Sequence, residues 1–331
     1  LERRLIAMKK SIEKVDSKIN DERINELDEW KQEILNGCID IKYPPHMKDE
    51  IIKFLIENKD KNDNVLFQYA CFILDNKIET TNNYKDAFDI MQLLAMNNNS
   101  NAQYKLGLCY YNGQGVEKDY AKALYWYKKG AEQNNSSAQN SIGFCYYNGN
   151  GIEKDYTQAV YWYKKAAEQG NYKAENNLGI LYSIGKGVEQ DYTQAFYWYK
   201  RSAEHGNASA QYNLGLYYHD GKAVEQDYTQ AVYWYKKSAE QGNKNAQCNL
   251  GYCYKTGQGV EQDYTQAVYW YKKSAEQGNA NAQHFLGSCY YQGRGVEQDY
   301  TQAAYWYKKS AEQGNAVAQN DLGYCYDKGQ G

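Results

Sequence analysis

The chain has 331 residues and a formal net charge of -3, so its basic and acidic side chains nearly cancel. Such a balance supplies no field that follows a phosphate backbone, which argues against nucleic-acid binding. No stretch is apolar for long enough to cross a bilayer, and we therefore expect no membrane insertion.

Residues 1–40 are predicted to form a charged amphipathic helix. Its apolar residues alternate spacings of four and three, as in a coiled-coil seam, at Leu1, Leu5, Met8, Ile12, Val15 and Ile19. The seam ends there, because the next core position holds Glu22. This favours a helix packed on another part of the protein, with self-association through a coiled coil as the alternative. Residues 41–65 follow as a short helical connector after Pro44 and Pro45.

Residues 66–101 are predicted to form a degenerate repeat that caps the segment after it. Three of its residues lie 36 positions before their counterparts in the next copy: Tyr84, Ala87 and Ala95 before Tyr120, Ala123 and Ala131. The glycines of the later copies are missing. Terminal repeats of an array commonly depart from the others in this way.

Residues 102–331 consist of a 36-residue unit that recurs without insertion or deletion, in six complete copies and a truncated seventh. The copies open on Ala102, Ala138, Ala174, Ala210, Ala246, Ala282 and Ala318. Six of them hold a tryptophan at one place, at Trp126, Trp162, Trp198, Trp234, Trp270 and Trp306. A fixed period of this length is typical of a solenoid, in which each copy packs on its neighbours.

The copy from 246 to 281 shows how one unit is built. Its first apolar residues have helical spacing, at Ala246, Leu250, Cys253 and Tyr254. Gly257 and Gly259 bracket a turn, and Asp263 is a suitable N-cap for a second helix. That helix buries Ala267, Trp270, Tyr271 and Ala275. The unit is therefore predicted to be a helical hairpin, and the fold all-α.

The repeated pattern A-x-x-N-L-G-x-x-Y-x-x-G-x-G-V-x-x-D, with a following W-Y and A-E-Q-G, resembles the Sel-1-like repeat, a relative of the tetratricopeptide repeat. The resemblance covers Ala102 to Gly331. Two departures are Ala223 in place of a turn glycine and Asn134 in place of a helix-end glycine. The resemblance implies an α/α solenoid, a right-handed superhelix whose concave groove binds proteins.

The cysteines point to packing and not to disulfides. Five of them share one repeat position, which Leu181 and Tyr217 fill in the other copies: Cys109, Cys145, Cys253, Cys289 and Cys325. A position that accepts these residue types is an apolar packing site. We therefore expect free thiols in a reducing compartment and a cytoplasmic location.

Three motifs in the unit superficially resemble a phosphate-binding loop, a catalytic carboxylate pair and a metal site. The glycine turn at 257–259 lacks the third glycine and the preceding strand of a phosphate-binding loop. The carboxylate of Asp263 is already needed as a cap. Cys248 and Cys253 point about 140° apart on a helix, so they do not converge with His284 and Cys289 on a metal. The sequence predicts no catalytic residue, no cofactor and no metal site.

Differences between copies point to a binding surface. The third and tenth positions of the first helix vary and are predicted to lie outside its buried stripe, whereas an exposed glutamine of the second helix is constant in five copies. Such variation indicates that first helices contact a partner. The predicted partner-binding groove consists of Tyr104, Lys105, Tyr111, Asn140, Tyr147, Asn176, Tyr212, His219, Lys255, His284, Phe285 and Tyr291.

The leading hypothesis is a non-catalytic adaptor that binds a protein or peptide in this groove. The alternatives are the regulatory arm of a signalling enzyme, with a kinase-like domain upstream of Leu1, and a luminal quality-control adaptor. The chain begins at Leu1 and ends inside a repeat, so we expect a piece of a longer protein. The open seventh copy predicts fraying after Ala318 or self-association through that end.

Overall fold

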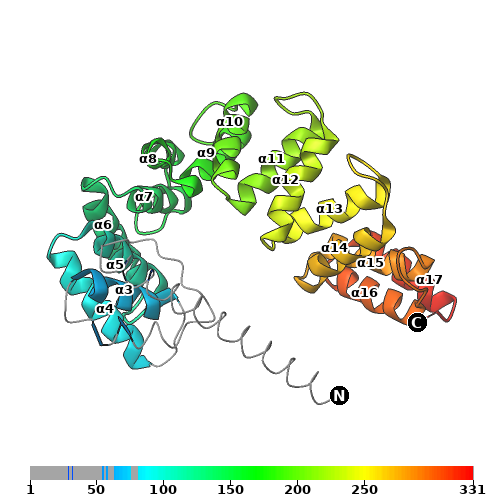
Figure 1. The fold of residues 1–331 in the computed structure, drawn as a ribbon, viewed down its shortest axis with the longest axis horizontal. Helices are drawn as coiled ribbons and strands as arrows, with labels where there is room; N and C mark the ends of the chain where they lie inside the picture. Colours follow the sequence, from blue (N-terminus) through cyan, green and yellow to red (C-terminus); the bar gives the residue numbers. More distant parts are fainter. Residues whose placement is uncertain are drawn as a thin grey trace, which may run out of the picture. The chain divides into compact units, whose positions relative to one another are not determined.

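The computed structural model describes residues 29, 32, 54–55, 57–58, 63–75 and 81–330. Over 63–75 and 81–330 the chain forms fifteen helices (Figure 1): α3 (Asp63–Asp75), α4 (Thr81–Met96), α5 (Ser100–Asn112), α6 (Tyr120–Glu132), α7 (Ser136–Asn148), α8 (Tyr156–Glu168), α9 (Tyr172–Ile184), α10 (Tyr192–Glu204), α11 (Ala208–Asp220), α12 (Tyr228–Glu240), α13 (Lys244–Thr256), α14 (Tyr264–Glu276), α15 (Ala280–Gln292), α16 (Tyr300–Glu312) and α17 (Ala316–Asp327). The all-α prediction is confirmed. The predicted helix over 1–40 and the connector over 41–65 lie almost wholly outside the described residues.

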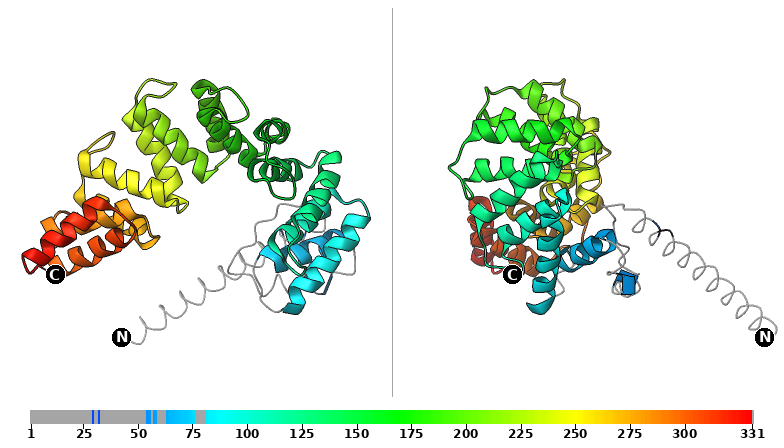
Figure 2. Two further views of the ribbon diagram at one scale, coloured as in Figure 1. Left: turned by 180° about the vertical axis from the view of Figure 1, so that it is seen from behind. Right: turned by 90° about the vertical axis from the view of Figure 1, so that its left-hand side faces the viewer.

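The chain divides into two compact units, Leu1–Lys154 and Asp155–Gly331. Within each unit, neighbouring helices in the chain pack side by side as hairpins (Figure 2). From α5 onward, odd-numbered helices are the first helices of the copies and even-numbered ones are the second helices. The segment 66–101 holds most of α3 and all of α4, and its assignment as a repeat stays a prediction.

Side-chain caps fix where each helix begins. The carboxylate of Asp263 accepts hydrogen bonds from the backbone N–H groups of Thr265 and Gln266, at 2.8 and 3.0 Å. Asn243 does the same for the first helix of that copy, toward Asn245 and Ala246. These bonds satisfy donors that the helix itself leaves without an acceptor.

The first turn glycine ends the first helix, as predicted. Gly257 has φ +75 and donates its N–H to the carbonyl of Cys253. The second turn glycine meets the previous copy, because a Cβ at Gly259 would collide with the carbonyl group of Tyr228. The two departures keep the same backbone, with φ +62 at Ala223 and φ +60 at Asn134.

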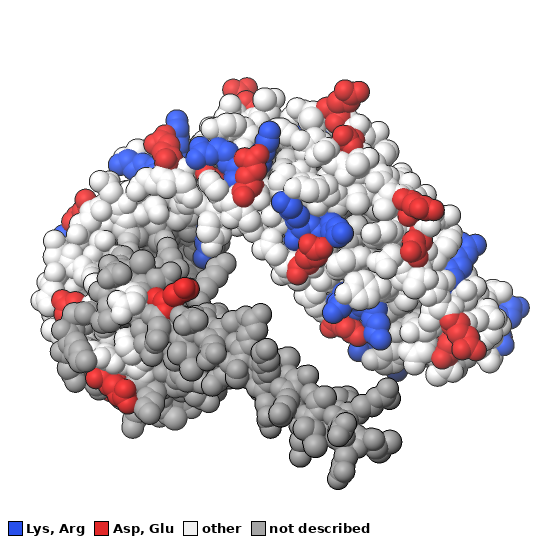
Figure 3. Space-filling model, in the orientation of Figure 1, with Lys and Arg blue, Asp and Glu red and all other residues white. Residues whose placement is uncertain are grey.

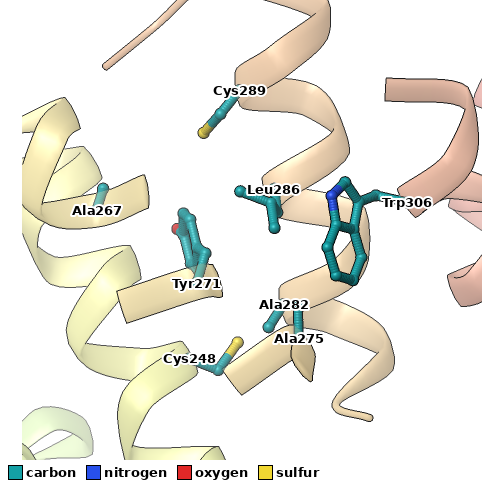
Figure 4. Close-up of a cluster of buried hydrophobic side chains, with 8 residues drawn as sticks. All are labelled: Cys248, Ala267, Tyr271, Ala275, Ala282, Leu286, Cys289 and Trp306. Atoms are coloured by element: carbon teal, nitrogen blue, oxygen red, sulfur yellow. The ribbon is translucent and has the colours of Figure 1, made fainter. Parts of the chain in front are cut away.

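A glycine of the first helix lets the hairpin close. A Cβ at Gly251 would lie 2.7 Å from Cδ1 of Tyr271, so the tyrosine ring packs directly on the glycine backbone. Tyr271 is fully buried and lies between Cys248 and Cys289, with Leu286 beside it (Figure 4). The same contact recurs at Gly107, Gly179, Gly215 and Gly287.

Two side-chain hydrogen bonds tie the helices of a hairpin together. Ser238 donates its hydroxyl to the carbonyl of Ala208 at 2.6 Å, and Gln241 donates to Oε1 of Gln211 at 2.7 Å. Gln211 in turn donates to the carbonyl of Ala203 on the preceding second helix, at 3.1 Å. The glutamine pair therefore links three successive helices.

One junction replaces this glutamine pair by charges. Glu175 is fully buried on α9, where other copies have glutamine, and its Oε2 lies 3.0 Å from Nδ1 of His205. Arg201 places Nη2 3.0 Å from the other carboxylate oxygen. A carboxylate has no proton to donate to the carbonyl of Ala167, and Arg201 reaches that carbonyl instead, at 3.5 Å.

Candidate first-helix interface

The third, fourth, seventh and tenth positions of each copy, counted from its opening alanine, lie on one side of the first helix. In α13 they are Cys248, Asn249, Tyr252 and Lys255. We call these four positions the first-helix face. All twelve residues predicted to bind a partner belong to it.

The third position is more buried than predicted. Cys248 is 5% exposed and Asn176 is 8% exposed, although the sequence pattern predicts that both lie outside the buried stripe. The reason is that the first helix is covered from two sides. Cys248 contacts a cluster formed by the second helix of its own copy and the first helix of the next, with Tyr271 and Leu286. Variation at this position therefore partly reflects packing between copies.

In the unit 1–154, the predicted residues are half-buried on α5 and α7. The hydroxyl of Tyr111 accepts a hydrogen bond from Nδ2 of Asn150 at 2.9 Å, and its ring centroid lies 5.0 Å from that of Tyr120. Lys105 forms an ion pair with Asp75 at 3.2 Å. The ring centroid of Tyr104 lies 6.2 Å from that of Tyr127. The remaining predicted residues of this unit are Asn140 and Tyr147.

On α9 and α11, the predicted residues also contact neighbouring elements. Asn176 accepts a hydrogen bond from Nδ2 of Asn213 at 3.4 Å, which joins the two first helices. The ring centroid of Tyr212 lies 6.1 Å from that of Tyr235. His219 has Nδ1 2.8 Å from Oδ1 of Asp220 and is half-buried.

Three predicted residues meet on α13 and α15. The Nζ of Lys255 lies 5.3 Å from the ring centroid of Phe285, and the rings of His284 and Phe285 are 5.5 Å apart. His284 also has Nε2 2.9 Å from Oδ2 of Asp321 on α17. Tyr291 donates its hydroxyl to Oε1 of Gln330 at 3.1 Å.

The seventh position is exposed in three copies and half-buried in the others, and none of the twelve predicted residues occupies it. Phe144, Tyr252 and Tyr324 are 42%, 39% and 50% exposed. Other copies carry Leu108, Ile180, Leu216 and Ser288 there. The sequence does carry a signal for this position. Its residues vary between copies, are mostly apolar, and stand at helical spacing from the third and tenth positions.

In the unit 155–331, exposed and half-buried residues of α13, α15 and α17 form two aromatic pairs, and α15 contributes one residue to each pair. The ring centroids of Tyr252 and Phe285 are 6.4 Å apart, and those of Tyr291 and Tyr324 are 6.3 Å apart. Lys255 supplies a positive charge over Phe285. We call Tyr252, Lys255, Phe285, Tyr291 and Tyr324 the α13–α17 strip. It offers rigid aromatic edges and a cation, which suits contacts with a protein segment.

The buried thiols have the properties of packing residues. Burial raises the pKa of Cys109 to about 12 and that of Cys253 to about 11, so both stay protonated near neutral pH. The shared cysteine position is buried in every copy, including Leu181 and Tyr217, which confirms the prediction of an apolar site. Among the described residues, no group of three His, Cys, Asp or Glu side chains is placed to hold a metal ion.

On the face shown in Figure 3, acidic and basic residues of the described segments lie interspersed. None of the helices in the described part of the chain is both long and apolar enough to span a membrane.

Comparison with known families decides what this architecture is. The Sel1 repeat model matches seven consecutive segments, 100–135, 136–171, 173–207, 208–243, 244–279, 280–315 and 316–331. The chain belongs to the Sel1 repeat family. The resemblance inferred from the sequence is thereby confirmed, and Sel1 repeats typically mediate interactions between proteins.

Two solved Sel1 repeat structures are similar along most of the chain. A protective antigen of uropathogenic Escherichia coli strains that displays this fold is 35% identical, with a TM-score of 0.68 over 91% of this chain and 67% of that one. A Sel1 repeat protein from Oxalobacter formigenes is 36% identical, with a TM-score of 0.68 over 75% of this chain and 99% of that one. Among curated proteins, none matches this Sel1 repeat chain.

Proposed function

We propose that this Sel1 repeat protein is a non-catalytic adaptor that binds a segment of a partner protein along its first-helix face. The observation that carries the proposal is the seventh position, where exposed and half-buried residues differ from copy to copy on a constant scaffold. Phe144, Tyr252 and Tyr324 are not isolated on the surface, because each ring centroid lies 6.1 to 6.4 Å from that of another aromatic residue of the same face. Adjoining exposed aromatic side chains are typical of interaction surfaces.

The α13–α17 strip supports a more specific form of the proposal. Its rings are held by contacts between copies, so little side-chain entropy is lost when a partner binds. Lys255 favours a partner segment with an acidic residue near an aromatic or aliphatic one. Affinity would come from several shallow contacts on successive first helices.

Selection of displayed peptides on the full chain tests the proposal. Peptides selected on the parent protein should lose at least about tenfold in affinity for the variant Phe144→Ala, Tyr252→Ala, Tyr324→Ala, because exposed aromatic anchors dominate such interfaces. The matched control is Tyr172→Ala with Tyr326→Ala, which removes comparably exposed tyrosines that lie outside the first-helix face. Equal binding to both variants, or failure to select any peptide, would contradict the proposal.

A further inference from the structure

The second helices α8, α10, α12, α14 and α16 present nearly the same exposed residues. In α12 these are Gln230, Tyr233, Lys237 and Glu240, at spacings of three, four and three residues, which place them in one line on the helix. The line recurs in α8, α10, α14 and α16, with Arg201 as the single replacement. We call it the second-helix stripe.

The stripe tyrosines are held rigidly but remain half-exposed. In the unit 155–331 each is 47% to 49% exposed. Each ring meets the following tryptophan edge to face, with centroids 4.9 to 5.4 Å apart, and a lysine or arginine lies 4.7 to 5.9 Å from its centroid. The tryptophans are anchored in the core: Trp234 packs with Ala195 and Tyr199 of the preceding copy.

These contacts explain why a tyrosine and a lysine recur in the stripe, because the lysine lies over the tyrosine ring. They do not explain why an exposed glutamine and an exposed glutamate recur beside them. By contrast, some first-helix positions that are more buried than the stripe differ between copies, for example the position of Cys248. An exposed set that stays the same in each copy indicates the same outside contact repeated along the array. A partner that makes such a contact must present its own groups at the spacing of the copies.

We propose that the partner on the second-helix stripe is a second copy of this chain, paired stripe to stripe about a two-fold axis. Each stripe carries one acid and one base, so an identical surface offers a base for every acid. Because both partners are the same chain, successive stripes have the same spacing in both, over all the stripes of a unit. This surface lies on different helices from the proposed partner-binding face and does not depend on it.

The exposed area is of the size that such pairing needs. A half-exposed tyrosine offers roughly 100 Å², so five of them supply about 500 Å² on each partner. The glutamine, lysine and glutamate of each stripe add to this, which brings the total to the range of specific interfaces, above about 1,200 Å². The pairing would be concentration-dependent and weakened by salt, because its charged contacts are at the rim.

Charge exchange on the full chain tests the pairing. One variant makes the stripes acidic, Lys237→Glu, Lys273→Glu and Lys309→Glu, and a second makes them basic, Glu240→Lys, Glu276→Lys and Glu312→Lys. Sedimentation velocity from about 1 µM to about 1 mM should show a dimer of the parent. Each variant alone should dimerise at least tenfold more weakly, and an equimolar mixture should recover a mixed dimer.

The two variants control for each other, since a loss caused by misfolding would not be restored on mixing. Circular dichroism should show equal helix content in all three proteins. A parent that stays monomeric over this range would overturn the proposal. So would variants that associate alone as strongly as the parent, which would place self-association elsewhere, for example on residues 1–40 or on the seventh copy.

Discussion

The first and second helices of this Sel1 repeat protein differ in which positions change between copies. Cys248 is buried on a first helix, yet its position holds Tyr, Asn, Cys or His in different copies. Tyr269 is half-exposed on a second helix, yet its position is constant in six copies. Burial alone therefore does not determine constancy. Positions stay constant where the same contact recurs in each copy, and they vary where neighbours or partners differ.

The largest effect should come from a constant contact between the two kinds of helix. Gly251→Ala would place a Cβ 2.7 Å from the Tyr271 ring and should lower the free energy of unfolding by about 3 kcal/mol, as overpacking does. Gly278→Ala is the matched control. It has φ +78 and nothing within 4 Å of the added carbon, so only backbone strain of about 1 kcal/mol is expected. Urea unfolding followed by circular dichroism measures both, and equal losses would refute the packing argument.

Substitutions at the charged junction should lower the free energy of unfolding more than the equivalent substitutions at a glutamine junction, though less than Gly251→Ala does. Glu175→Ala leaves Arg201 without its buried partner and should cost about 2 kcal/mol, less than for a fully buried pair because Arg201 is partly exposed. Gln247→Ala removes two neutral hydrogen bonds at an equivalent place, one from Gln277 and one to the carbonyl of Ala239. It should cost about 1 kcal/mol, because the exposed Gln277 can bond to water instead.

The charges at this junction should be replaceable only as a set. The triple variant Glu175→Gln, Arg201→Lys, His205→Gln restores the residues of other copies and should unfold within about 0.5 kcal/mol of the parent. A triple variant as unstable as Glu175→Ala would show that the junction differs in backbone geometry and not only in its side chains.

The smallest stability effect should appear at the departures from glycine in turns. Ala223→Gly should raise the free energy of unfolding by about 1 kcal/mol, because φ +62 is costly for alanine. Asn134→Gly should change it by less than about 0.5 kcal/mol, since asparagine tolerates the same backbone at φ +60. Equal gains at both positions, measured by thermal unfolding, would contradict this difference.

Much of the fold could be predicted from the sequence, because its period, turn glycines and capping aspartates each have a local physical cause. Asp263 and Gly257 act as the pattern predicts. The contacts between copies could not be predicted in the same way. Ser238 and Gln211 are ordinary helix residues in the sequence, and only the packed hairpin shows that they bind a distant carbonyl and a distant amide. For the same reason, the third position was predicted to be surface, whereas the next copy covers Cys248.

The central claim is that partner recognition depends on how the copies differ along the first-helix face. The most direct test makes the exposed seventh position uniform, with leucine as in Leu108 and Leu216: Phe144→Leu, Ile180→Leu, Tyr252→Leu, Ser288→Leu and Tyr324→Leu. Calorimetric titration with a peptide selected on the parent chain should show at least about a tenfold loss of affinity, with unchanged helix content. Unchanged affinity in the uniform protein would contradict the claim, because recognition would then not reside in the differences between copies.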